Sequence, residues 1–235
     1  MRRLWGVLIA TAILSVAARA AEDAGALDEE NAAGLKIQTY GTEFHSAPRL
    51  LIDDYQGSEI ENRLGGRANI YVQNPSRVMV SRAAMDTEGT NPSAVLMLTY
   101  DKKNEGGPYG GGGWCGYYTL LKQLRHGEED IYFDALPFQA ITFKVKGETG
   151  KENFLVGLAD RHWDKVGDAL KSLQIGEYLD EGHVTTNWQT ARIPMEEFFL
   201  DRSKLSSISF GFETACFPDG SGQGTIYLDD LKLEK

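Results

Sequence analysis

Two predicted β-strands within residues 138–160 constrain the fold of this chain more than any other stretch. In both strands apolar side chains alternate with polar or small ones, which is the period of two typical of a half-buried strand. The segment between them, residues 146–151, carries two glycines and several charges, so the pattern predicts a β-hairpin. In the second strand Gly157 and Ala159 point away from the apolar set. We expect these small residues to floor an open face of the sheet.

The rest of the chain is dominated by similar short segments. Together with the central pair they make roughly ten strands, and few stretches have a helical pattern. This composition predicts an all-β fold, a sandwich of two antiparallel sheets. The other predicted strands are residues 50–55, 68–73, 77–82, 94–101, 114–122, 190–193, 206–213 and 225–233. A helix is predicted at residues 163–173 and a helical turn at residues 195–199.

The N-terminal region is predicted to lie outside this sandwich. Residues 1–20 begin with two arginines, continue with an apolar run and end in Ala-Arg-Ala, as in a signal peptide, although an uncleaved anchor is the alternative. We expect cleavage after Ala20, export to the periplasm or the medium, and no membrane insertion afterwards. Residues 21–48 read as an acidic, partly disordered leader, and residues 49–235 as the binding domain.

The charge of the chain limits its partners. The formal charge is −10, and removal of Arg2, Arg3 and Arg19 with the signal peptide makes it −13. Without a basic patch, such a chain is not expected to bind nucleic acid or anionic lipid, and neutral or cationic ligands fit better.

The chain has two cysteines, Cys115 and Cys216, both in the part predicted to be exported. An oxidising compartment favours a disulfide between them, and the alternative is two buried free thiols. A bridge would close a loop of about a hundred residues and contribute about 4–5 kcal/mol by the chain-entropy relation.

Motifs spread along most of the chain resemble those of the galactose-binding-like jelly-roll domains, in particular the family 11 carbohydrate-binding modules and the complex I intermediate-associated protein 30 family. The matching segments are LIDDYQG at 51–57, the turn at 62–66, residues 185–198, and the closing pair ISFGFE and GTIYLDDLKL. The resemblance implies a β-sandwich that binds without catalysis. It also implies that Trp188, which begins a strand, is a core residue.

The same resemblance implies a structural calcium ion. In similar domains an aspartate of the closing strand and residues of the opening strand hold the ion, so Asp229 and Asp54 are the candidate ligands here. Gln56 stands where the family often has glutamate, which lowers the charge of the site. The alternative is that Asp229 and Asp230 only cap a β-bulge, which the slip in alternation at this point predicts.

The candidate ligand site is built on the small-residue face. Gly157, Ala159, Ser209 and Gly211 would form a shallow groove if their strands are neighbours. Flat aromatic rings beside hydrogen-bonding groups suit sugars. We therefore expect a polysaccharide or oligosaccharide to bind there, although Arg161 could instead form an exposed ion pair. The predicted ligand-binding residues are Tyr109 and Trp114 from the glycine-rich run, and Arg161, Trp163 and Glu213 as walls.

No catalytic signature accompanies this site. Acidic residues are present, but their spacing singles out no pair for glycoside hydrolysis, and the four histidines show no metal-ligand spacing. The favoured hypothesis is an exported, non-catalytic glycan-binding module. The alternatives are a protein-binding or assembly factor of the same fold, which would need an exposed apolar patch, and a glycoside hydrolase.

Overall fold

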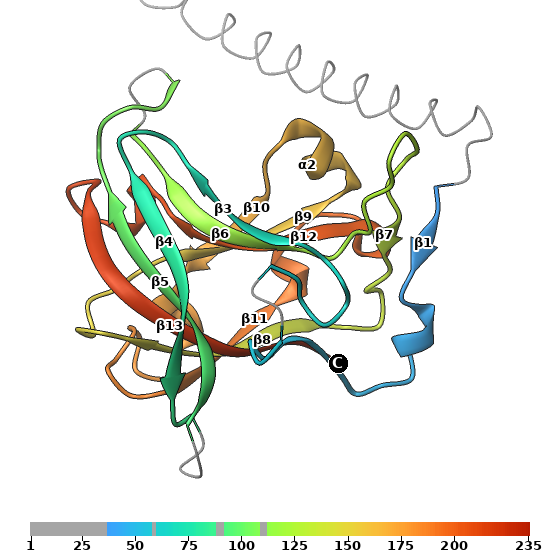
Figure 1. Cartoon of the computed structure of the whole chain (residues 1–235), viewed down its shortest axis with the longest axis horizontal. Coiled ribbons are helices and arrows are strands. Elements are labelled where there is room, and N and C mark those ends of the chain that lie inside the picture. The colour runs from blue at the N-terminus through green and yellow to red at the C-terminus, as the bar shows by residue number, and fades with distance from the viewer. Residues whose placement is uncertain (1–36, 58–59, 88–91, 109–111) are drawn as a thin grey trace, which may run out of the picture. The chain divides into compact units, whose positions relative to one another are not determined.

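The computed structural model describes residues 37–57, 60–87, 92–108 and 112–235 (Figure 1). The chain divides into two compact units, Met1–Gln38 and Thr39–Lys235, and the described secondary structure belongs to the second. The predicted signal peptide and most of the predicted leader lie outside the described residues. Within the described ranges, no helix has the length and apolar character needed to cross a membrane.

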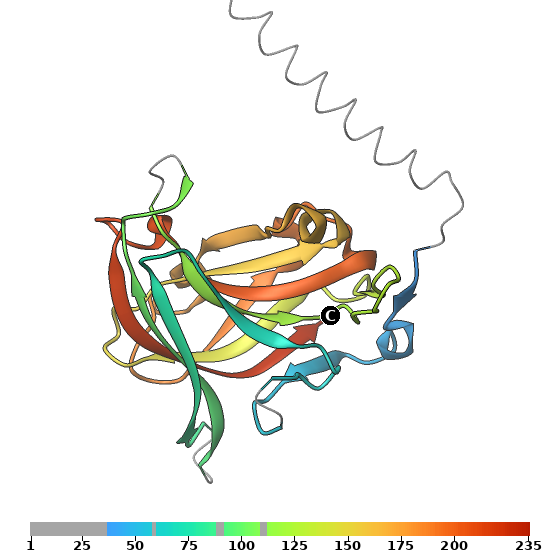
Figure 2. The same cartoon turned by 45° about the horizontal axis from the view of Figure 1, so that its top comes forward.

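The second unit is a sandwich of two β-sheets, which confirms the predicted fold class (Figures 1 and 2). Its strand pairs are antiparallel apart from the parallel pair of β1 and β7. Sheet A contains β1 (Thr39–Tyr40), β3 (Ala68–Val72), β6 (Cys115–Leu120), β7 (Tyr132–Phe133), β9 (Leu155–Asp160), β10 (Leu170–Gln174) and β12 (Leu205–Phe212). Sheet B contains β2 (Arg49–Asp53), β4 (Arg77–Met85), β5 (Ser93–Lys102), β8 (Ala140–Gly147), β11 (Gln189–Pro194) and β13 (Gly222–Glu234).

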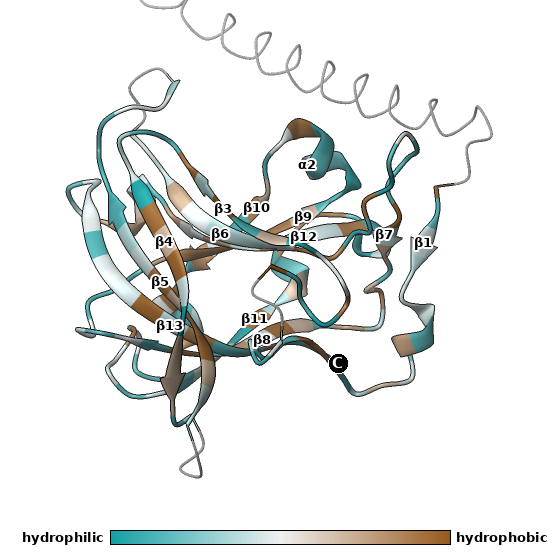
Figure 3. Ribbon diagram, viewed as in Figure 1, coloured by the Kyte–Doolittle hydropathy of each residue, from teal (hydrophilic) through white to brown (hydrophobic). Residues whose placement is uncertain are grey.

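The hydrophobic core lies between the two sheets. Brown and teal segments alternate along several strands in Figure 3, because successive side chains of a strand point to opposite faces. Phe143 of β8, Phe154, and Phe210 of β12 meet in the middle, with ring centroids 5.1 to 6.4 Å apart. Burial of apolar side chains throughout this core, of which these rings are the centre, is the main source of the stability of the sandwich.

The predicted hairpin between the two central strands is wrong. β8 pairs with β11 and β13 in sheet B, whereas β9 pairs with β10 and β12 in sheet A. The two strands therefore face each other across the core, and residues 148–154 cross from one sheet to the other. Alternation shows which side chains of a strand share a face, but not which strand supplies its hydrogen-bond partners.

The carboxylate of Glu152 organises this crossover. It is almost fully buried, and it accepts hydrogen bonds from the backbone N–H groups of Thr149, Gly150 and Lys151 and from the Thr149 hydroxyl, at 2.8–3.0 Å. Burial by itself raises the pKa of Glu152, but these hydrogen bonds outweigh it and the net pKa lies below the usual value. The loop is thus folded around a charged carboxylate.

The described helical elements are short, and one of them differs from the prediction. The predicted turn at residues 195–199 is present, but the helix predicted at 163–173 is replaced by α2 and then by β10. The Asp160 carboxylate caps the N-terminus of α2 by accepting a hydrogen bond from the Trp163 N–H (3.0 Å). Gly167, with φ of 79°, ends the helix. The described helical elements are α2 (Arg161–Val166) and the 3-10 turns η1 (Thr42–Phe44), η3 (Ile175–Tyr178), η4 (Met195–Glu197), η5 (Arg202–Lys204) and η6 (Thr214–Cys216).

Residues 39–48, predicted to be part of the leader, contain β1 and η1 of the sandwich unit. The ring of Tyr40 packs edge-on against Phe133 with centroids 5.3 Å apart, and its hydroxyl donates to the Leu121 carbonyl oxygen. Phe44 also packs against Phe133, with ring centroids 6.5 Å apart, so two aromatic side chains attach this region to sheet A.

The predicted disulfide is also wrong. Cys115 and Cys216 are both buried free thiols. The Cys216 thiol donates to the Gly211 carbonyl oxygen (3.8 Å), while Cys115 points into the core from β6. The alternative that the sequence left open, two buried free thiols, is therefore confirmed. Burial raises the pKa of Cys115 to about 12 and that of Cys216 to about 11.

Two further expectations concern the second sheet. The bulge in the closing strand is confirmed, because the register of β13 shifts between Asp229 and Lys232 and Asp230 has φ of 54°. Trp188 is not a core residue. It is partly exposed, and its indole N–H donates to the Asp86 carbonyl oxygen at 3.1 Å.

Candidate functional site

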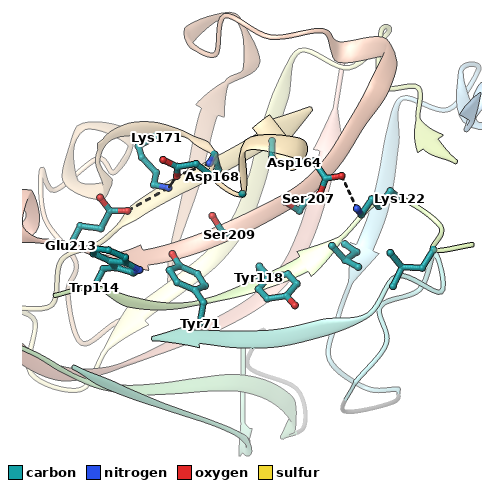
Figure 4. A pocket seen from close by; sticks show the side chains of 15 residues that line it. Tyr71, Trp114, Tyr118, Lys122, Asp164, Asp168, Lys171, Ser207, Ser209 and Glu213 are labelled. Atoms are coloured by element: carbon teal, nitrogen blue, oxygen red, sulfur yellow. Dashed lines mark hydrogen bonds and ion pairs between the residues drawn. The ribbon is translucent and has the colours of Figure 1, made fainter. Parts of the chain in front are cut away.

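A groove of about 750 Å³ lies on the outer face of sheet A, opposite the core (Figure 4). Strands β3, β6, β12, β9 and β10, and the segment after α2, contribute to it. Its lining consists of three aromatic residues, five charged residues and small or aliphatic ones. They are Tyr71, Trp114, Tyr118, Leu120, Lys122, Leu124, Ala159, Asp164, Gly167, Asp168, Ala169, Lys171, Ser207, Ser209 and Glu213.

The floor of the groove is the predicted small-residue face, with one correction. Ser207 pairs with Ala159 and Ser209 pairs with Gly157 across β12 and β9, and Ala159 and both serines line the groove. The glycines do not lie bare. A β-carbon at Gly157 would overlap the Ser209 hydroxyl and lie 3.5 Å from Cδ of Lys171.

Tyr71 covers the second predicted glycine. A β-carbon at Gly211 would lie 2.8 Å from the Tyr71 hydroxyl, and one at Gly116, its partner on β6, would lie 2.5 Å from the same oxygen. The two paired glycines therefore let the ring of Tyr71 lie close against the sheet. Burial and then the nearby Glu213 carboxylate raise the pKa of Tyr71 well above its usual value, so it keeps its proton as a hydrogen-bond donor.

Three aromatic side chains form one side of the groove (Figure 4). Trp114 immediately precedes β6, Tyr118 lies four residues further on the same face, and Tyr71 comes from the neighbouring strand β3. The alternate residues Cys115 and Tyr117 point into the core. The period of two thus sends one set inward and leaves the other on the groove, and all three groove rings are only partly buried.

Lysine–carboxylate pairs form the other side. Near Trp114, the Lys171 ammonium lies 3.1 Å from Oδ1 of Asp168 and 3.5 Å from Oε1 of Glu213. Burial raises the pKa of Asp168, but the Ala169 N–H and the bond from Lys171 outweigh it, so the net pKa is lowered and the carboxylate is ionised at neutral pH.

A second group of charges lies further along the groove. The Lys122 ammonium donates to Oδ2 of Asp164 (2.6 Å) and lies 2.7 Å from Oδ2 of Asp130, and the Tyr132 hydroxyl also donates to Asp164 (3.1 Å). Burial alone would lower the pKa of Lys122, but its bonds to both carboxylates outweigh this and raise it. Each groove lysine is therefore neutralised by acidic neighbours, and neither presents an uncompensated charge to a ligand.

The predicted ligand-binding residues are only partly brought together. Trp114 and Glu213 line the groove. Arg161 and Trp163 do not: Arg161 donates to Glu129 (2.7 Å), and Trp163 packs against His162 with ring centroids 5.5 Å apart. From the same helix it is Asp164 that reaches the groove. Tyr109 lies outside the described residues.

The sequence reasoning missed most of the lining residues, among them Tyr71, Tyr118, Lys122 and Lys171. Tyr118 carried a signal, because it shares the face of Trp114 and Gly116 in the alternation of β6. Tyr71 and the two lysines, Lys122 and Lys171, carried none, since their position depends on the order of strands in sheet A. Lys171 was moreover assigned to a helix, whereas it pairs with Gly157 on β9 as part of β10.

The two candidate calcium ligands lie apart from this groove, at the end of β2 and in β13. Asp54 accepts two hydrogen bonds from the Arg63 guanidinium, with Nε at 2.9 Å from Oδ1. Burial raises the pKa of Asp54, but these bonds outweigh it and lower the net pKa. Asp229 is buried, which raises its pKa.

Two observations weigh against a calcium ion held by Asp54 and Asp229. The guanidinium already occupies both oxygens of Asp54, and the described ranges contain no group of three or more acidic, histidine or cysteine side chains that could hold a metal. Calcium binding stays a prediction.

A comparison with protein families gives one match, the family described as Carbohydrate binding domain 30, over residues 65–235. A search of curated proteins found no match. Similar solved structures include a family 11 carbohydrate-binding module from Clostridium thermocellum in complex with a β-1,3-1,4-mixed-linked tetrasaccharide. It has a TM-score of 0.54 and 16% identity, and the match covers 79% of this chain and 95% of that one.

The family 30 carbohydrate-binding module of a cellulosomal cellulase of Clostridium thermocellum is also similar, with a TM-score of 0.52 and 19% identity, over 79% of this chain and 98% of that chain. At these identities the structures establish a shared β-sandwich fold. They confirm at that level the predicted resemblance to family 11 modules. The resemblance to the complex I intermediate-associated protein 30 family stays a prediction.

Proposed function

The chain belongs to the carbohydrate binding domain 30 family, and from this premise we propose that the groove on sheet A holds a neutral glycan chain against Tyr71, Trp114 and Tyr118. The protein is thus a carbohydrate-binding module. The observation that carries the choice of site is the row of three partly exposed aromatic rings beside hydroxyl and charged groups (Figure 4). Pyranose rings offer flat C–H faces and many hydroxyls, which such a surface can contact together.

The length of the aromatic row favours an oligosaccharide over a single sugar. Trp114 and Tyr118 are four residues apart along an extended segment, which corresponds to about 13 Å. Ser207 and Ser209 lie between the aromatic side and the charged side, where their hydroxyls can exchange hydrogen bonds with a sugar chain.

The electrostatics of the groove favour a neutral glycan over one rich in uronic acids. Lys122 is paired with Asp164, and Lys171 with Asp168 and Glu213, so the lining holds two positive and three negative groups. The chain as a whole carries a formal charge of −10. An anionic polysaccharide would be repelled by the net negative charge of the whole chain as it approaches, and by the carboxylates of the groove once it is bound.

Titration calorimetry with soluble polysaccharides tests this proposal. Mixed-linked β-1,3-1,4-glucan is the first ligand to try, because an oligosaccharide of that linkage is bound in the family 11 structure. Removal of a stacked ring by Trp114→Ala or Tyr118→Ala should cost about 2 kcal/mol, which is about thirtyfold in Kd. Trp163→Ala is the matched control, since this ring lies outside the groove, and it should change Kd less than twofold.

Two results would contradict the proposal. If Trp163→Ala abolished binding while both groove variants bound normally, the site would lie around α2 and not in the groove. If no neutral polysaccharide bound, the alternative of a protein-binding or assembly factor would gain support, and tighter binding of polygalacturonate than of any neutral glucan would refute the charge argument.

We also propose that the chain binds without hydrolysing its ligand. The groove carboxylates of Asp164, Asp168 and Glu213 are each in an ion pair with a lysine, whereas glycoside hydrolysis needs one protonated and one free carboxyl across the scissile bond. Prolonged incubation with a ligand that binds should release no reducing ends, and measurable release would overturn this part of the proposal.

Export is proposed from residues 1–20. If they are a signal peptide, expression of the full chain in a bacterial host should give a secreted or periplasmic protein whose intact mass corresponds to a start at Ala21. A full-length mass in the cytoplasmic fraction would contradict it.

A further inference from the structure

Lys102, the last residue of β5, has no exposed surface although its side chain is charged. Its ammonium donates to the hydroxyl of Thr214 (2.7 Å) and to the carbonyl oxygen of Gly220. In the described part of the chain it forms no ion pair with a carboxylate. Burial of an ammonium without a counter-ion is costly, and this burial lowers the pKa of Lys102.

The contacts of Lys102 lie behind the Trp114 end of the groove. Thr214 begins η6, directly after Glu213, whose carboxylate pairs with Lys171 in the groove. The ammonium of Lys102 therefore holds η6 at Thr214, and Thr214 is the sequence neighbour of the groove residue Glu213.

Gly112, two residues before Trp114, packs on the same contact. A β-carbon at Gly112 would lie 2.5 Å from the Thr214 hydroxyl and 3.4 Å from the Lys102 ammonium, and Gly112 has φ of 81°. The next residue, Gly113, donates its N–H to the Lys103 carbonyl oxygen at 3.1 Å. The two glycines that precede Trp114 and the threonine that follows Glu213 thus all lie against the end of β5.

We propose that Lys102 is a positioning residue of the glycan groove, which fixes Trp114 and Glu213 relative to each other by joining η6 to Gly112 and Gly113 on the core side of the groove. This inference rests on the proposed function of the groove. Lys102 has no exposed surface, so it does not contact the ligand. It acts through the two segments that it holds, and the glycines at 112 and 113 are required because a side chain there would occupy the space of the Thr214 hydroxyl and of Ser76.

The test uses the full chain and two sets of variants. Lys102→Met keeps an unbranched side chain that is one atom shorter and removes the three donors, and Lys103→Met is the matched control at the neighbouring, partly exposed lysine. Thr214→Ala removes one acceptor of the contact, whereas Thr214→Ser retains a hydroxyl. The Thr214 pair keeps the proposal testable if Lys102→Met does not fold.

Two quantities are measured for each variant. The first is Kd for mixed-linked β-glucan by calorimetry. The second is the fluorine NMR spectrum of protein labelled with 5-fluorotryptophan, in which the Trp114 signal is assigned by Trp114→Phe. Lys102→Met and Thr214→Ala should shift or broaden the Trp114 signal, leave those of Trp163 and Trp188 unchanged, and weaken binding about tenfold, while Thr214→Ser and Lys103→Met should resemble the wild type.

An unmoved Trp114 signal with a Kd within twofold of the wild type, in Lys102→Met or in Thr214→Ala, would overturn the proposal. Equal shifts of the Trp114, Trp163 and Trp188 signals would also overturn it, because they would indicate a general loss of stability. If the wild-type chain binds no glycan, the proposed function fails, but the Trp114 signal still decides whether Lys102 positions this residue.

Discussion

Replacing Glu152 by glutamine should destabilise the sandwich by about 3 kcal/mol, although the change removes one charge and no atoms. The two carboxylate oxygens of Glu152 accept four hydrogen bonds from Thr149, Gly150 and Lys151. A glutamine has one acceptor and one donor group, so in either orientation its NH₂ group faces two N–H or O–H donors. Two charge-assisted bonds are lost, each contributing about 1.5–3 kcal/mol, and partial opening of the loop to water keeps the total near the lower limit.

Thermal unfolding followed by circular dichroism measures this effect. For a domain of this size about 3 kcal/mol corresponds to a fall in Tm of about 6–12 °C. Glu177→Gln is the control, because Glu177 is an exposed glutamate of η3, and it should change Tm by less than about 2 °C. The core packing of both sheets is unchanged in either variant, so the difference isolates the carboxylate.

The pH dependence gives an independent check of the cause. The pKa of Glu152 is lower in the folded chain than its unfolded value of 4.5, so the stabilisation is fully present above pH 4.5 and is lost as pH falls through the folded pKa. The stability difference between wild type and Glu152→Gln should therefore be constant from pH 7 to about 5 and shrink in more acidic solution. Equal Tm values at pH 7, or a difference that grows on acidification, would refute the reasoning.

Three further outcomes are expected. Alkylation of unreduced, denatured protein should add two adducts, because Cys115 and Cys216 are free thiols. A mass without adducts would show that the two cysteines form a disulfide. Gly116→Ala should lower Tm and weaken glycan binding, since its β-carbon would lie 2.5 Å from the Tyr71 hydroxyl and overlap the Phe210 carbonyl oxygen, whereas Gly57→Ala, with nothing within 4 Å, should do neither. Addition of a chelator should leave Tm unchanged, because Arg63 occupies the carboxylate of Asp54, and a drop of several degrees would establish the calcium site after all.

Local periodicity was a sound guide to which residues of a strand share a face. Along residues 114–118 it separated Trp114, Gly116 and Tyr118 from Cys115 and Tyr117. In the structure Trp114 and Tyr118 line the groove, Gly116 lies against Tyr71, and the second set points into the core. It failed where a second element decides the outcome. In the segment after β9 a helical interpretation extended to residue 173, but Gly167 ends the helix and β10 continues as a strand beside β9.

The candidate site was predictable in part. The alternation in residues 206–213 indicated Glu213 as a wall of the groove, and the glycine-rich run indicated Trp114. Arg161 and Trp163 were assigned to the groove because they follow its floor in sequence, but α2 directs them elsewhere and turns Asp164 toward the groove. Tyr71 reaches it from β3, which is far away in sequence and becomes a neighbour of β6 only through sheet pairing.

The sequence by itself determined that this protein is a two-layered β-sandwich with a small-residue face, because side chains of a strand alternate between faces at every position whatever the partner strand is. The choice of partners was decided only by the tertiary structure. It placed β8 and β9 in opposite sheets, brought Tyr71 over the glycines of β6 and β12, and buried Lys102 behind the groove. These are contacts between residues distant in sequence, and they form because both sheets must bury one continuous core, a requirement that no single segment encodes.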